Sequence, residues 1–144
     1  MNREIKFRGR RYDNGEWIYG SLVDWGNHEQ LVIFPPLETA SSLPLETIIA
    51  MKAKSVDYKT IGQYTGVKDS KGTEIYEGDI IEGTIVSQWN KEVIYCVVEY
   101  IKDGFFSVEY FSNNSYTPHK LLFGKDCKVV GNIYDDIELL KERF

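Results

Sequence analysis

The chain has 144 residues, which is enough for one compact domain or for two small units that share a core. Its apolar content of 42% excludes a disordered protein, and its net charge of −5 argues against a binder driven mainly by nucleic-acid phosphates. Aromatic residues make up 14% of the chain, which favours β structure because Tyr and Trp suit half-buried strand surfaces.

The N-terminal region predicts three strands. Residues 4–8 alternate polar and apolar side chains, as in a half-buried strand with Ile5 and Phe7 inward. A turn signal at residues 13–15 separates this strand from a returning one at 17–23, which together predict a hairpin. A third strand is expected at 30–34, where two prolines stop it.

The middle of the chain is less regular. Residues 35–47 have loop composition, and 44–54 suit either a short helix or a strand, with the Thr-Ile-Ile run favouring a strand. From residue 56 onward the pattern is β, and a terminal helix is expected at 135–143 because acids come early and bases late. The later strands are expected at 58–65, 80–89, 92–101, 104–111 and 127–134.

These elements predict a mainly β fold, because short strands at this spacing are typical of small barrels and sandwiches. An N-terminal β subdomain is expected over residues 1–62. A small SH3-like β-barrel closed by a short C-terminal helix is expected over 63–144.

The first eleven residues are strongly basic, with five Arg or Lys against one Glu, whereas residues 63–144 hold fourteen acidic and nine basic groups. Aromatic residues follow closely, so the sequence predicts a binding surface. Three interpretations remain open: an edge strand kept soluble by charge, a surface that docks onto an acidic subunit, or a platform for single-stranded nucleic acid. The surface comprises Lys6, Arg8, Arg10, Arg11, Trp17 and Tyr19.

No residue set points to catalysis, a metal or a cofactor. His28 and His119 are isolated, and His119 follows a proline in an expected exposed loop; a base–nucleophile pair of His119 with Cys127 would need a geometry that the sequence does not show. Gly78 and Asp79 look structural, because glycine relieves backbone strain and a carboxylate accepts hydrogen bonds from turn amides. We therefore expect no catalytic residues, no metal and no cofactor.

The cellular location is predicted from the lack of an apolar N-terminal segment and of a membrane-spanning run. The N-terminus is polar from residue 2, and no run approaches the ~18 apolar residues that span a membrane. Cys96 and Cys127 have no CxxC spacing, which predicts two buried reduced thiols. A cytoplasmic protein without membrane contact is expected.

Three segments carry a resemblance to a known family. They are Arg3–Gly9, the strand-turn-strand segment Ile61–Ile81, and Gly131–Asp135 before the terminal helix. Together and in this order they resemble the YopX family of bacteriophage and prophage proteins. The resemblance implies a phage-borne accessory protein acting in a bacterial host, a mainly β fold and self-association. It supplies no catalytic residues.

The expected function is a non-enzymatic protein-binding or self-assembly module. A homo-oligomer is expected, with the N-terminal strand near the contact as an edge whose backbone groups another chain can pair. The alternative is a single-stranded nucleic-acid binder that uses the basic N-terminal strand. A third class, an enzyme with an unfamiliar site, would show as a deep pocket lined by ionisable groups.

Overall fold

The structure is a computed structural model that describes residues 4–24, 26, 31–36, 42–120 and 127–141. It confirms the mainly β fold, since strands dominate and the two helices of the described residues are short. The chain divides into two compact units, residues 1–64 (unit 1) and 65–144 (unit 2). The division lies within strand β4 (Lys54–Lys68), two residues after the boundary expected from the sequence.

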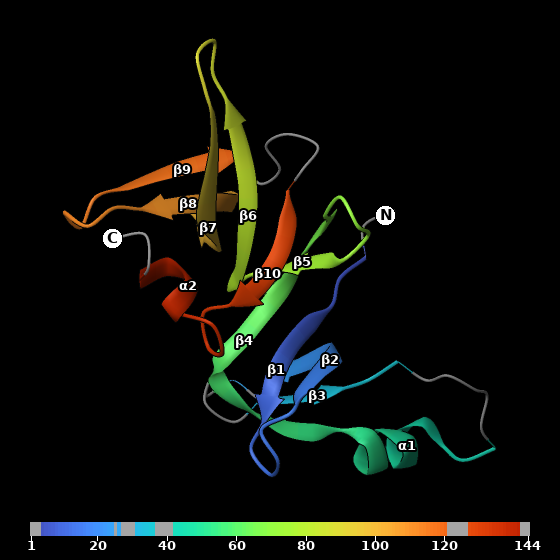
Figure 1. Ribbon diagram of the computed structural model, residues 1–144. Helices are drawn as coiled ribbons and strands as arrows, with labels where there is room; N and C mark the ends of the chain where they lie inside the picture. Colours follow the sequence, from blue (N-terminus) through green and yellow to red (C-terminus); the bar gives the residue numbers. More distant parts are fainter. Residues whose placement is uncertain (1–3, 25, 27–30, 37–41, 121–126, 142–144) are drawn as a thin grey trace. The chain divides into compact units, whose positions relative to one another are not determined.

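Unit 1 is built on antiparallel strands that close on each other (Figure 1). Strand β1 (Phe7–Arg11) pairs with β2 (Trp17–Asp24), β2 with β3 (Leu31–Phe34), and β3 with β4. Strand β1 also pairs with β4, which completes a ring. The sequence-based prediction of an edge strand at the N-terminus is therefore wrong, because β1 has a hydrogen-bonded neighbour on each side.

The core of unit 1 lies on one side of these strands. Leu31, Ile33 and Val56 are buried, and Phe7 and Ile18 pack against them. Residues two apart along β1 share a face, so Phe7 and Gly9 turn toward this core. A Cβ at Gly9 would lie 3.1 Å from Val56 Cβ, so only glycine lets the strand pack this closely.

A bulge in β4 lets β1 pair along its length. The register between these strands shifts between Arg8 and Arg10. The buried Thr60 satisfies the interrupted ladder, because its hydroxyl accepts the Arg10 amide proton at 2.9 Å and donates to the Asp57 carbonyl at 2.7 Å. A side chain here replaces a missing backbone partner.

Helix α1 (Leu45–Lys52) corrects the preference for a strand at residues 44–54. Pro44 precedes its first turn, and the Pro44 carbonyl accepts hydrogen bonds from the amides of Thr47 and Ile48. None of its residues is buried, so helical propensity rather than packing decides its conformation.

Unit 2 contains a five-stranded antiparallel sheet with the order β10-β6-β7-β8-β9. Short strand β5 (Glu74–Tyr76) continues the first sheet beside β4. Within the described residues, the strand order of this five-stranded sheet is that of an open sheet, and SH3-like closure stays a prediction. The strands are β6 (Asp79–Val86), β7 (Lys91–Ile101), β8 (Gly104–Tyr110), β9 (Tyr116–Lys120) and β10 (Lys128–Asn132), followed by helix α2 (Glu138–Lys141).

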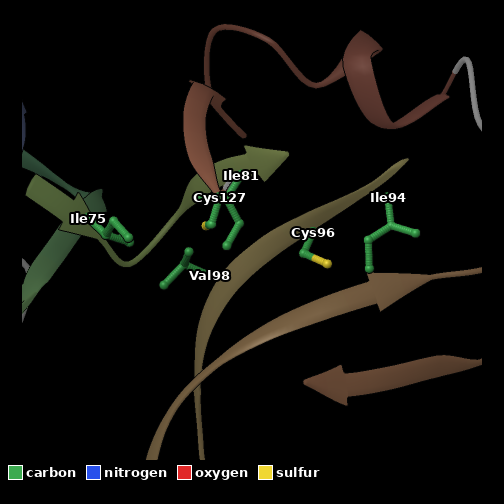
Figure 2. Close-up of a cluster of buried hydrophobic side chains, with 6 residues drawn as sticks. All are labelled: Ile75, Ile81, Ile94, Cys96, Val98 and Cys127. Atoms are coloured by element: carbon green, nitrogen blue, oxygen red, sulfur yellow. The ribbon is translucent and has the colours of Figure 1, made fainter. Parts of the chain in front are cut away.

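The sheet of unit 2 has two apolar faces. One, the thiol face, carries Ile81, Cys96 and Val98, with Ile75 and Cys127 packed beside them (Figure 2). The other, the helix face, carries Ile80 and Val97, against which Leu140 of α2 packs. The alternation of side chains along β6 and β7 produces both faces.

A single buried carboxylate joins the turn after β4 to β10. Asp69 Oδ1 accepts hydrogen bonds from the amides of Lys71 and Thr73 at 2.9 and 2.8 Å, and Oδ2 accepts one from Val129 at 2.9 Å. Burial by itself would raise the pKa of Asp69. The hydrogen bonds from these three amides together outweigh burial, so the pKa lies below the ordinary value.

We predict that Asp69→Asn lowers the free energy of unfolding by about 2–3 kcal/mol at neutral pH, because an amide NH₂ would face buried N–H donors. The greater stability of the wild type over Asp69→Asn requires the ionised carboxylate. This stability difference is fully present above the unfolded pKa of about 3.9 and is lost as pH falls through the lower folded pKa. Urea denaturation across this pH range measures it, with exposed Asp103→Asn as the control. An equal loss in both variants would contradict the prediction.

Candidate functional site

The basic N-terminal residues form a stacked cluster on the face of β1 that is opposite the unit 1 core. Arg10 lies directly across from Trp17 in the β1–β2 register, and Arg8 lies across from Tyr19. The guanidinium carbons of Arg8 and Arg10 are 4.9 and 5.2 Å from the centre of the Trp17 ring. Two cations thus share one indole.

The other members of the predicted surface are distributed around this stack. Lys6 Nζ lies 5.4 Å from the centre of the Tyr64 ring, while Arg11 forms a two-pronged ion pair with Asp13 at 2.6 and 2.9 Å. Tyr19 is exposed. The structure therefore brings together Arg8, Arg10 and Trp17, and it places Arg11 in a separate pair.

Burial changes what this cluster can do. The Arg8 side chain belongs to a residue only 5% exposed, so its guanidinium is committed to the protein interior and to the Trp17 ring. A nucleic-acid platform presents open aromatic faces on which bases stack. The observed stacking instead suits a structural role for Arg8 and Trp17.

A second feature lies in unit 2, where the helix face is hollowed beside α2. A cavity of about 550 Å³ opens there, within the usual size range of ligand pockets. Its apolar lining comes from β7, from the β8–β9 turn and from the segment that ends in α2. The apolar residues are Val97, Phe111, Ile133, Ile137 and Leu140.

One polar pair stands at this cavity. The Tyr110 hydroxyl donates a short hydrogen bond to Glu99 Oε2, and both residues line the cavity. Burial and the Glu99 carboxylate together raise the pKa of Tyr110, so the phenol stays protonated at all ordinary pH values. Among the described lining residues, Glu99 thus supplies the charged group, a hydrogen-bond acceptor in an apolar wall.

Hydrogen bonds in the turn before α2 fix the segment that contributes Ile133 and Ile137 to the cavity lining. Asn132 Oδ1 accepts the amide protons of Tyr134 and Asp135, each at 2.9 Å. The Ile133 amide donates to the Gly78 carbonyl at 2.9 Å, and the Gly78 amide donates to Val98 at 2.8 Å. Gly78 has a φ of 91°, as its predicted structural role requires.

The cysteines lie away from this cavity, on the thiol face. Both are buried, as predicted, and burial raises the pKa of Cys96 to about 12 and that of Cys127 to about 11. A nucleophile needs thiolate, which these values suppress. His119 corrects another expectation, because it lies on β9, partly buried, with Nε2 3.2 Å from Glu109 Oε1.

Two acidic residues of β6, Asp79 and Glu82, have hydrogen-bond and ion-pair partners within the protein. Asp79 Oδ2 accepts the Tyr76 amide proton at 2.7 Å, and Glu82 accepts the Tyr95 hydroxyl and pairs with Lys128. Across the described residues, no three His, Cys, Asp or Glu side chains gather as metal ligands would. His28 lies outside the described residues. Neither described helix has the length and apolar character needed to cross a bilayer.

Sequence reasoning missed the cavity and one exposed side chain, Trp89, at the tip of the β6–β7 hairpin. The cavity residues come from three separate segments, so no local pattern marks them. Trp89 did carry a signal, because a large apolar residue between Ser87 and Asn90 stands in a polar turn where packing does not require it.

Comparisons with known proteins agree with this architecture. The chain matches the model of the family described as YopX protein over residues 6–141. Since this match spans nearly the whole chain, the protein belongs to the YopX family, as the resemblance of its three segments indicates.

A solved structure shows the same fold. The chain is similar to the crystal structure of protein EF1440 from Enterococcus faecalis, with 21% identity and a TM-score of 0.57. The alignment covers 96% of this chain and 99% of that one. No curated protein matches the chain.

We predict that Arg8→Ala lowers the free energy of unfolding by about 2 kcal/mol, because it removes a buried stem and a cation stacked on Trp17. Arg11→Ala is the matched control on the same strand. It breaks a solvent-exposed ion pair and should leave the urea midpoint almost unchanged. Equal midpoints for the two variants would show that the Arg8 stack contributes no stability.

We also predict that Cys96 and Cys127 react very slowly with a disulfide reagent in the native protein at pH 8 or so, because both thiols are buried and protonated there. In denaturant both should react at the rate of a free thiol. Timed absorbance of the released chromophore measures this. Rapid native labelling of either cysteine would contradict the burial described here.

Proposed function

We propose that the protein is a non-enzymatic protein-binding module, a phage or prophage accessory protein that acts in the cytoplasm of a bacterial host. The observation that carries the proposal is the apolar cavity beside α2. Its exposed rim includes the aromatic rings of Tyr110 and Phe111, with Tyr116 stacked near Tyr110 at a centroid distance of 6.1 Å. Aromatic residues at the edge of an apolar pocket are typical of protein-binding hot spots.

The chemistry of the lining supports binding rather than turnover. A general acid–base pair needs groups whose pKa values lie near the working pH. The Tyr110 phenol is held protonated by burial and Glu99, and the other lining residues that the structure describes are apolar or uncharged. What fits best is an apolar side chain of a partner that also offers a hydrogen-bond donor or positive charge to Glu99.

The nucleic-acid alternative stays a prediction for unit 1. Burial of Arg8 and the engagement of Trp17 by two guanidiniums do not favour it. Binding to single-stranded DNA or RNA that weakens steeply with salt would support it. Lys6 and Arg10 are the residues to reverse in such a test, because both are more exposed than Arg8.

We predict that N-acetyltryptophanamide, an isolated aromatic side chain, binds in the cavity and shifts the NMR signals of Val97, Ile133 and Leu140 but not those of unit 1. Ile137→Glu should weaken this binding at least tenfold or so, because a second carboxylate enters the apolar lining near Glu99. The matched control is Ile5→Glu, another exposed isoleucine that lies in unit 1. Shifts spread over the surface, or equal affinity in both variants, would refute the cavity as the binding site.

A further inference from the structure

The tip of the β6–β7 hairpin presents apolar side chains to solvent. Trp89 is 89% exposed and Val86 is 68% exposed, and Val93 is exposed beside them. Single exposed apolar residues are ordinary, but a tryptophan with two valines at one tip is a small contiguous patch. Such a patch marks a contact surface.

The tip is held in a defined shape. The Ser87 amide donates to the Asn90 carbonyl at 2.8 Å, and Ser87 Oγ accepts the Asn90 amide proton at 3.0 Å. The hairpin also projects from its sheet (Figure 1), because among the described residues the pairing of β8 with β7 begins at Val97 and that of β10 with β6 ends at Glu82. Trp89, called the knob below, thus stands on an ordered turn, so that its backbone loses little conformational entropy on binding.

The tip of the hairpin and the cavity beside α2 carry opposite charges. Val86 and Lys91 are directly paired, so they lie on one face of the hairpin with Val93, while Glu92 points to the opposite face. The apolar face of the tip therefore carries a positive charge. Among the described residues that line the cavity beside α2, Glu99 is the negative one, and its carboxylate can accept a hydrogen bond from the indole N–H of Trp89.

The two features cannot meet within one chain. Trp89 and Val97 are separated by eight residues of which most form one extended strand, which spans roughly 25 Å. The knob of one molecule can reach only the cavity of another. A cavity of about 550 Å³ has room for an indole ring.

We propose that the partner bound in the cavity is a second copy of this chain, which inserts Trp89 beneath α2 and places Lys91 near Glu99. This inference rests on the cavity being the binding site of the proposed function. The contact is heterologous, since knob and cavity are different surfaces, so each molecule can bind one neighbour and be bound by another. Assembly then proceeds head to tail, independently of β1.

Two variants separate the surfaces. Trp89→Ala keeps the cavity and loses the knob, whereas Ile137→Glu keeps the knob and blocks the cavity. Each alone should be a monomer of 16.7 kDa by light scattering, while the wild type forms larger species as concentration rises. An equimolar mixture should give a complex of about twice the monomer mass and nothing larger, because only one knob–cavity contact can form.

Controls keep the test decisive. Tyr12→Ala removes another exposed aromatic residue, 62% exposed and in unit 1, and should assemble like the wild type. Ser112→Trp blocks the cavity from an exposed loop position and replaces Ile137→Glu if that variant fails to fold. A monomeric wild type, or a mixture that stays monomeric, overturns the proposal.

A separate titration tests the cavity as a binding site, independently of self-assembly. N-acetyltryptophanamide is titrated into Trp89→Ala, whose cavity is empty of any neighbour. Binding there together with a monomeric wild type would overturn the second copy as partner and retain the cavity as a site for another protein. Absence of binding there would overturn both proposals.

Discussion

The buried carboxylate of Asp69 is the interaction on which unit 2 depends. It binds the turn after β4 to the first residues of β10, and the Ser70 amide adds a bond to the Cys127 carbonyl at 3.0 Å. Strand β10 in turn leads into the Asn132 turn that seats α2. These contacts follow one another along the backbone, so Asp69 and the segment that lines the cavity are connected through β10.

The two faces of the unit 2 sheet differ in how they are filled. The thiol face is filled by Ile75 and Cys127, and its two sulfur atoms are held protonated by burial (Figure 2). On the helix face, Leu140 of α2 packs against Ile80 and Val97, and the cavity lies beside this contact. The helix face thus combines a packed cluster with an apolar hollow, whereas the thiol face is filled.

The strands and turns of this fold are readable from sequence because their signals are local. Alternation predicts most strands to within a few residues, and Gly78 reveals its turn by residue type alone. Helix α1 was missed because it buries nothing and therefore lacks an amphipathic pattern. The double pairing of β1 and the cavity beside α2 depend on residues far apart in the chain, which propensity and periodicity do not encode.

The ring of unit 1 constrains the order in which the chain can fold. Strand β1 pairs with residues 56–63 of β4, about fifty positions later in the sequence. Such distant contacts must overcome loop-closure entropy before they stabilise anything, so they form late and slowly. During synthesis the first three strands must therefore wait, with one side of β1 unpaired, until β4 leaves the ribosome. Arg8, Arg10 and Arg11 lie along this temporary edge, and charged side chains oppose the pairing of an open edge with another chain, a consequence of the N-terminal charge that the closed ring conceals.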